Sequence, residues 1–461
     1  MRMLGTVDHR PRPGTVVEFD PVATGTPRRH GVPASCFQTG HFRLAAENRS
    51  RGAVHSPWVA FSFDLPERAD LDALAAAWSD FTSRHEALRS WYEPGPGDGF
   101  TGWVHEPGTV QMKIRDVGDF GTAEELGAHL NRRFDEATDP HRWPGPLFCA
   151  VLRPSSTTCY FAVDHAYSDG YSVAALFEEV RALYRQHRGG PAARLRRVDG
   201  CLSVNAWEAR TLAELTPKAL AEPRWEPWRA FFRGSGLSDF PADVGNPRQE
   251  LLPAVCQELP LLDAGEASAF RDFCRARGGG FAAGLFAGLA VVQREVTGEG
   301  LYRVLTSVST RFEPRRIATQ GWLINLAPVV FDVSDGAGLS EAVRRAQVAF
   351  EEARRLVDCP VHRAVELMAD AGAVDPGQMR IPPMVSYLDG RATPGADAYE
   401  EAAATMYTGP DNAIGVSLWV SWFRSGVSVV VRSPGTPQAA RSVPAHLERL
   451  GGCLRTALRR G

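Results

Sequence analysis

The sequence predicts a mixed α/β fold with two lobes, and three observations support this. The chain has 461 residues, which is too long for one ordinary core and fits two lobes of roughly 200 residues each. Both halves mix helical and strand-like patterns, and the turn-forming run Arg188-Gly189-Gly190-Pro191 lies between them. We therefore expect an N-terminal lobe over residues 1–190, a linker over residues 191–250 and a C-terminal lobe over residues 251–461.

The N-terminal half begins with residues 1 to about 40, whose prolines and glycines predict an irregular arm. After this arm, hydrophobic periodicity predicts each element in turn. The expected elements are a strand at 58–65, a helix from about 70 to 84, strands within 99–116, a helix at 122–134, strands at 148–152 and 159–163, and a helix at 171–186. Residues 164–170 then form a strand-to-helix loop, a common place for a functional site.

The second half repeats this alternation of helices and strands. Short helices are expected at 202–215 and 225–232. After them we expect helices at 264–277 and 281–297, strands at 301–309 and 323–333, helices at 339–356 and 361–371, strands at 384–388, 413–423 and 426–431, and a last helix at about 443–458.

The composition narrows the class of protein. Hydrophobic residues make up 44% and charged residues 23%, as in a soluble globular protein, and a net charge of −3 gives no field that would attract nucleic acid. The N-terminus lacks the apolar core of a signal peptide, and the apolar stretch from Phe281 to Val292 is too short to span a bilayer. Eight cysteines are spread singly from Cys36 to Cys453, so we expect reduced thiols, no metal site and a cytoplasmic location.

The loop Asp164-His165-Ala166-Tyr167-Ser168-Asp169-Gly170 carries the candidate chemistry. His165 suits a general base because the ordinary pKa of an imidazole lies near ambient pH. Asp169 precedes a helix and can cap its free N–H groups, while Gly170 permits a tight turn or a close backbone approach. The residues alone leave three interpretations open: a capped strand-helix junction with a structural histidine, a catalytic base, or a metal site.

This loop resembles the His-His-x-x-x-Asp-Gly signature of nonribosomal peptide condensation domains, chloramphenicol acetyltransferase relatives and polyketide-associated acyltransferases. Other segments resemble the same superfamily, in its order along the chain. They are Arg84-His85-Glu86-Ala87-Leu88-Arg89-Ser90, the inter-lobe segment from Trp225-Glu226-Pro227-Trp228 to Gly234-Ser235-Gly236-Leu237, Thr306-Ser307-Val308-Ser309-Thr310-Arg311 and Gly321-Trp322-Leu323-Ile324-Asn325-Leu326-Ala327-Pro328. The segments Pro33-Ala34-Ser35-Cys36-Phe37-Gln38 and Pro383-Met384-Val385-Ser386-Tyr387-Leu388-Asp389-Gly390-Arg391 look closest to the polyketide-associated branch.

The resemblance implies a fold and a role for each matching residue. It implies two chloramphenicol acetyltransferase-like lobes in a V-shaped pseudo-dimer, with the active site in a tunnel between them. His165 matches the catalytic histidine, and Asp169 matches a structural residue that pairs with Arg311.

Four further residues complete the expected site. Asn325 falls on the buried asparagine of the superfamily, with an ordinary strand-end polar residue as the alternative. Trp322 and Tyr387 are expected to line the substrate channel or, alternatively, to belong to the core. Asp164 departs from the pattern, because it stands where the family has its first histidine.

The resemblance also implies the activity. We expect an acyltransferase that condenses an acyl thioester, carried by coenzyme A or by the phosphopantetheine arm of a carrier protein, with an acceptor hydroxyl. The alternatives are a free-standing amide-forming condensation enzyme and a catalytically silent module that recruits a partner. We expect no permanently bound cofactor, a carrier protein and a small-molecule acceptor as partners, and a monomer. No Gly-x-Ser-x-Gly nucleophile elbow occurs in the sequence.

Overall fold

A computed structural model describes residues 1–5, 9–52, 58–95, 97, 99–216, 221–233, 240–374 and 384–460. The chain divides into two compact units. Unit 1 comprises Met1–Arg210, Arg311–Leu323 and Ala392–Asp411, and unit 2 comprises Thr211–Thr310, Ile324–Arg391 and Asn412–Gly461. Residues 311–323 and 392–411 thus belong to unit 1, although the sequence analysis placed them in the C-terminal lobe. The predicted lobe boundaries, the V shape and the tunnel stay predictions.

Unit 1 is built on a seven-stranded sheet, counted over the described residues, with the order β1-β14-β4-β9-β8-β2-β7. A smaller sheet has the order β3-β6-β5. The strands are β1 (Arg2–Gly5), β2 (Gly14–Ala23), β3 (Arg28–His30), β4 (Trp58–Leu65), β5 (Ser90–Pro94), β6 (Phe100–Val104), β7 (Val110–Phe120), β8 (Leu147–Leu152), β9 (Thr157–Asp164) and β14 (Thr405–Thr408). The helices are α1 (Cys36–Ser50), α2 (Leu71–Arg84), α3 (Ala123–Ala137), α4 (Gly170–His187) and α5 (Cys201–Glu214), which ends in unit 2.

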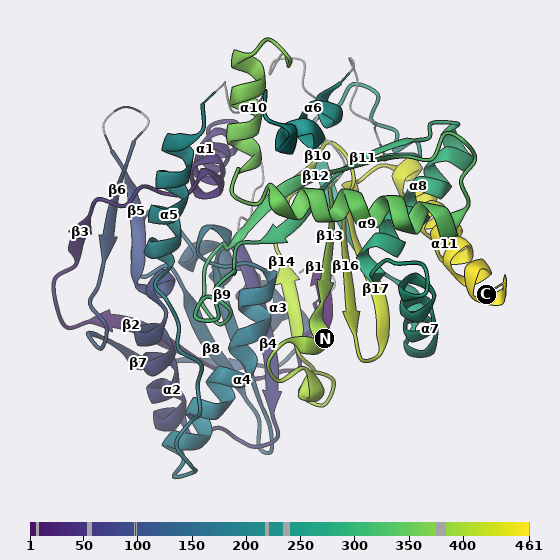
Figure 1. The fold of residues 1–461 in the computed structure, drawn as a ribbon. Coiled ribbons are helices and arrows are strands. Elements are labelled where there is room, and N and C mark those ends of the chain that lie inside the picture. Colours follow the sequence, from purple (N-terminus) through teal and green to yellow (C-terminus); the bar gives the residue numbers. More distant parts are fainter. Residues whose placement is uncertain are drawn as a thin grey trace. The chain divides into compact units, whose positions relative to one another are not determined.

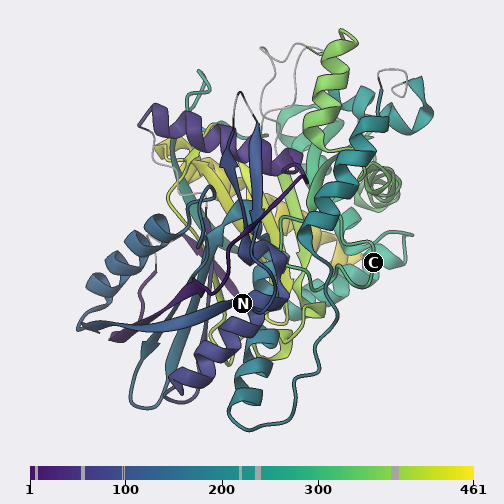
Figure 2. The ribbon, with the colours of Figure 1, turned by 90° about the vertical axis from the view of Figure 1, so that its left-hand side faces the viewer.

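Helices cover both faces of this sheet (Figures 1 and 2). On one face, Leu126, Leu130 and Phe134 of α3 pack against Trp58 and Tyr160. On the other face, aromatic rings of α2 and α4 contact the sheet at Phe61, Phe63 and Phe161. Because alternate residues point to opposite faces and helices cover both of them, β9 is buried along its whole length and β4 at every residue except Asp64. Both strands therefore read as nearly continuous apolar runs.

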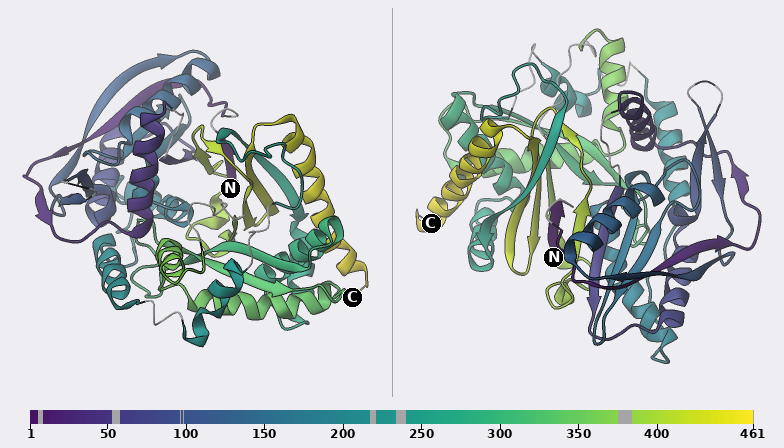
Figure 3. Two further views of the ribbon diagram at one scale, coloured as in Figure 1. Left: turned by 90° about the horizontal axis from the view of Figure 1, so that it is seen from above. Right: turned by 180° about the vertical axis from the view of Figure 1, so that it is seen from behind.

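Unit 2 repeats the same architecture with a sheet of order β12-β11-β13-β16-β17-β10-β15. Its strands are β10 (Leu252–Asp263), β11 (Leu301–Ser309), β12 (Ile324–Asp332), β13 (Met384–Asp389), β15 (Asn412–Ala413), β16 (Ser417–Phe423) and β17 (Gly426–Pro434). Its helices are α6 (Glu226–Phe232), α7 (Ala264–Arg275), α8 (Phe281–Thr297), α9 (Leu339–Arg355), α10 (Val361–Asp370) and α11 (Pro437–Arg460). The C-terminal helix α11, yellow in Figure 3, runs along α7 and α8.

Helices α7, α8, α9 and α11 share one apolar core with the sheet of unit 2, which includes Phe270, Phe286 and Leu450. Helices α6 and α10 contribute to a second core around Trp225 and Trp228. Mixed helices and sheets in both units confirm the predicted fold class. None of the helices in the described part of the chain is long and apolar enough to cross a membrane.

The prediction of an irregular arm over residues 1–40 is wrong. This segment holds β1, β2, β3 and the start of α1, and β2 pairs with both β7 and β8 inside the main sheet. The prolines of this segment favoured an irregular structure, because a proline lacks the N–H that a central strand requires. Pro21 lies where β2 pairs with β7 but beyond its pairing with β8, which covers Thr15 to Glu18, so the missing N–H interrupts no ladder to β8.

Candidate functional site

His165 follows the end of β9, which lies between β4 and β8 in the middle of the main sheet of unit 1. The strand ends at Asp164, whose side chain accepts a hydrogen bond from the Ala166 amide at 2.8 Å. This bond starts the single 3-10 turn η3 (His165–Tyr167), and α4 follows at Gly170. The expected strand-to-helix loop is therefore present. His165 lies directly after a strand that is buried along its whole length.

The imidazole of His165 is partly exposed but lies in dense surroundings. Its ring centroid is 4.2 Å from that of Trp322, and its buried Nδ1 has no hydrogen-bond partner on another described residue. Burial, followed by repulsion from His41, lowers the pKa of His165 below its ordinary value of 6.5. Its own backbone, Asp169 and Asp164 act in the opposite direction and are outweighed. A neutral imidazole is the form that can accept a proton.

Asp164 has a partner that the sequence analysis missed. Its side chain is fully buried, and Oδ1 lies 3.0 Å from Nε2 of His41 on α1. Gln38, one turn earlier on α1, donates from Nε2 to the Ala166 carbonyl at 2.8 Å. Ser35 and Gln38 form a capping box at the start of α1. The pattern Ser-x-x-Gln was the signal in the sequence that could have located this helix.

Asp169 and Arg311 form the expected pair. Arg311 donates from Nη1 and Nη2 to the two carboxylate oxygens, at 2.9 and 3.0 Å, and the amides of Ser172 and Leu323 donate to the same carboxylate at 2.8 and 2.9 Å. Burial by itself would raise the pKa of Asp169, but the charge and hydrogen bonds of Arg311 and the two amides lower it below the ordinary value. This carboxylate is therefore an ionised anchor, because every donor around it stabilises its charge.

Residues 319–323 are bound to the start of α4 by further hydrogen bonds. Gln320 donates from Nε2 to the Ser172 carbonyl at 2.7 Å, and the Ser172 hydroxyl donates to the Gly321 carbonyl at 3.1 Å. Arg311 also donates to the Ser172 hydroxyl, at 2.6 Å. These contacts hold Trp322 against His165.

Gly170 shows neither the tight turn nor the close backbone approach that was expected for it. A Cβ at this position would lie 3.9 Å from Cε of Met406, an ordinary van der Waals distance, and φ is not in the left-handed region. Two backbone amides at the start of α4 are occupied within unit 1. Those of Ser172 and Val173 already donate to the side chain and carbonyl of Asp169.

The remaining predicted residues lie in unit 2. Asn325 is buried, donates to the Val357 carbonyl at 3.0 Å, and accepts from the amides of Leu326 and Val361. Tyr387 stacks on Phe281 at a centroid distance of 5.5 Å and packs against the main core of unit 2. A role of Trp322 or Tyr387 in lining a channel stays a prediction. Residues 234–237 and 383, which carry part of the resemblance, lie outside the described residues.

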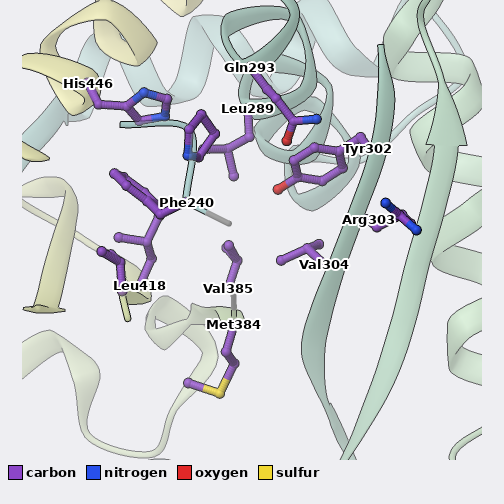
Figure 4. Close-up of a pocket in the computed structure, with 12 residues that line it drawn as sticks. Phe240, Leu289, Gln293, Tyr302, Arg303, Val304, Met384, Val385, Leu418 and His446 are labelled. Atoms are coloured by element: carbon purple, nitrogen blue, oxygen red, sulfur yellow. The ribbon is translucent and has the colours of Figure 1, made fainter. Parts of the chain in front are cut away.

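Unit 2 contains an apolar pocket, shown in Figure 4, between α8, β11, β13 and β16. His446 lines it with two ring nitrogens that have no hydrogen-bond partner among the described residues, and burial lowers its pKa to about 4. None of the predicted site residues lines this pocket. Across the same described residues, no group of three or more His, Cys, Asp or Glu side chains could hold a metal ion.

The sequence matches the model of the condensation-domain family over residues 30–381, so the chain belongs to this family. It is similar to "Acyltransferase PapA3" of Mycobacterium tuberculosis, with 25% identity over 97% of this chain and 95% of the relative. It is also similar to "Trehalose-2-sulfate acyltransferase PapA2" of the same species, with 27% identity over 95% and 94% of the two chains. The protein is an acyltransferase of the condensation-domain type, which confirms the predicted class of enzyme.

Solved structures support the fold. The structure described as "PapA2 acyl transferase" superposes with a TM-score of 0.88, covering 99% of this chain and 100% of that chain at 23% identity. This similarity confirms the predicted mixed α/β fold of the chain.

Proposed function

We propose that this acyltransferase forms an ester, by moving an acyl group from a thioester to a hydroxyl group of a small acceptor with His165 as the general base. The observation that carries the proposal is the state of His165. Its ring is partly exposed on a turn that Asp164, Asp169 and Arg311 hold, and its pKa lies below the ordinary value. Because Nδ1 is buried, we assign the contact with the acceptor to Nε2, the other ring nitrogen.

The proposed reaction needs one base and no covalent enzyme intermediate. Nε2 of His165 takes the proton of the acceptor hydroxyl while its oxygen attacks the thioester carbonyl carbon. The tetrahedral intermediate then collapses, the carbon–sulfur bond breaks, and the imidazolium returns the proton to the leaving thiolate. Arg311 and Asp169 do not take part in these steps, because each satisfies the charge of the other.

The family resemblance supplies the donor and the acceptor of the proposed reaction. A phosphopantetheine thioester, on coenzyme A or on a carrier protein, supplies the acyl group, and the product thiol leaves with the returned proton. One of the relatives is named as a trehalose-2-sulfate acyltransferase, which supports a carbohydrate hydroxyl as the acceptor class. No permanently bound cofactor is required for this reaction.

The test measures acyl transfer from palmitoyl-coenzyme A to trehalose and to glucosamine. Thiol release gives the rate, and mass spectrometry identifies the products. Ester products are cleaved by hydroxylamine and amide products are not, so the same assay separates the two activities. We expect His165→Ala to abolish ester formation and the control His187→Ala to retain it. His187 pairs with Asp80 at 2.8 Å, at the other end of α4.

Three results would contradict the proposal. Full activity of His165→Ala would exclude His165 as the base. Hydroxylamine-resistant products would favour the amide-forming alternative. Binding of an acyl carrier protein without any consumption of its thioester would favour a recruitment module.

A further inference from the structure

Asp164 is a buried carboxylate beside the proposed base. It is fully inaccessible, and Oδ1 contacts two donors, His41 Nε2 at 3.0 Å and the Ala166 amide at 2.8 Å. Oδ2 has no hydrogen-bond partner in the described part of the chain. An ionised carboxylate is costly to bury unless a charged or hydrogen-bonding partner compensates for it. His41 is the titratable partner in this position.

His41 also contacts the ring that lies on His165. Its imidazole meets Trp322 edge to face, with centroids 5.5 Å apart and planes at 89°. Trp322 in turn lies 4.2 Å from His165. Helix α1 cannot shift freely, because Gln38 donates to the Ala166 carbonyl at 2.8 Å and accepts from Asn205 at 2.8 Å.

We propose that His41 is a positioning residue for His165, holding the Asp164 carboxylate on one side and the Trp322 indole on the other, so that it sets both the orientation and the charge state of the base. The catalytic part of this inference rests on the proposed function. The coupling between the two histidines does not, because it can be measured without substrate.

The charged groups around His165 determine the sign of the effect. His41 faces it from α1, Asp164 from β9, and Asp169 from the start of α4, where Arg311 neutralises the carboxylate. Repulsion from His41 lowers the pKa of His165, whereas Asp164 and Asp169 raise it. Removing His41 takes away this repulsion and, as long as Asp164 stays ionised, leaves its carboxylate without the balancing His41, so the change raises the pKa of His165.

Three variants separate orientation from charge. His41→Phe keeps an aromatic ring against Trp322 and removes the donor to Asp164. His41→Gln keeps an N–H near the position of Nε2 but carries no charge. The double variant His41→Phe with Asp164→Asn removes both members of the pair. His187→Phe is the matched control, since His187 pairs with Asp80 at the surface of the same unit.

The first measurement is an NMR titration of the full chain with labelled histidine, with the His165 signal assigned from its loss in His165→Ala. We expect His41→Phe to raise the pKa of His165 by roughly one unit. His41→Gln should raise it by less, the double variant should return it toward the wild-type value, and His187→Phe should leave it unchanged. If His41→Phe does not fold, His41→Gln carries the test alone.

The second measurement is the pH profile of acyl transfer from palmitoyl-coenzyme A to trehalose. We expect His41→Phe to lower kcat roughly tenfold with little change in KM, because a displaced base affects the reacting geometry. His41→Gln should recover most of kcat. The midpoint of the acidic limb of its pH profile should stay at a higher pH than in the wild type.

An unchanged pKa of His165 in His41→Phe and His41→Gln would overturn the proposal, as would an equal shift in His187→Phe. Failure of the proposed function has a different signature. In that case His165→Ala retains activity, while the NMR shift on changing His41 still shows the coupling.

Discussion

Arg311 donates two nearly equal hydrogen bonds, 2.9 and 3.0 Å long, to the carboxylate of Asp169, 142 residues earlier in the chain. Both side chains are almost fully buried, with 5% and 4% of their surfaces exposed. The pair joins the start of α4 to residues 311–323, which follow β11 of unit 2. Unit 1 is therefore assembled from distant parts of the sequence around this ion pair.

Replacing Arg311 should destabilise unit 1 strongly. Arg311→Leu leaves the Asp169 carboxylate buried without its cation, and breaking a buried pair in this way costs about 3–5 kcal/mol. Arg185→Ala is the control, because Arg185 and Glu178 form an exposed pair in the same unit, worth about 0–1 kcal/mol. Urea denaturation measures both, and equal losses in the two variants would contradict a structural role for Arg311.

The contribution of Asp169 to stability should depend on pH. Its pKa is lowered in the folded protein, so the stabilisation is fully present above the unfolded value of about 3.9 and is lost as the pH falls through the folded value. We expect the difference in unfolding free energy between wild type and Asp169→Asn to be constant above about pH 5 and to shrink at lower pH. A difference independent of pH down to pH 3 would be inconsistent with an ionised Asp169.

Acyl transfer should gain activity with increasing pH below neutrality. Because the pKa of His165 lies below 6.5, the neutral base predominates at pH 6.5 and above. We expect the acidic limb of kcat/KM to have its midpoint below pH 6.5, measured by thiol release from an acyl-coenzyme A. A midpoint clearly above that value would show that another group controls the reaction or that His165 is more solvated than its surroundings indicate.

Gly170 should tolerate alanine in the folded protein. The added Cβ would lie 3.9 Å from Met406, and an alanine in a helical conformation reduces the entropy of the unfolded chain. We expect Gly170→Ala to change the unfolding free energy by less than about 1 kcal/mol. Gly14→Ala should be clearly destabilising, because its Cβ would meet the Leu152 carbonyl oxygen at 2.5 Å. Thermal unfolding of the two variants compares them, and a large loss in Gly170→Ala alone would contradict this prediction.

Local pattern was sufficient for many of the strands and helices, of which β4 and α2 are examples. The strand predicted at 58–65 is β4, and the helix predicted from about 70 to 84 is α2 with Asp70 as its N-cap. The predictions succeeded there because buried strands and amphipathic helices have a pattern of apolar residues that can be recognised in the sequence. The arm over residues 1–40 failed because its strands are short or carry proline, and partner strands far along the chain decide whether such segments pair.

The sequence by itself determined the family, the mixed α/β class, the central position of His165 and, through its matching residues, the pairing of Asp169 with Arg311. Only the tertiary structure decided what surrounds these residues. In the structure His41 contacts Asp164, 123 positions away in the sequence, and Trp322 packs against His165. Neither contact can be predicted from the spacing of these residues along the chain. The physical reason is that a buried charge must find a partner in space, and the fold of the sheet and of α1 determines which side chain supplies it.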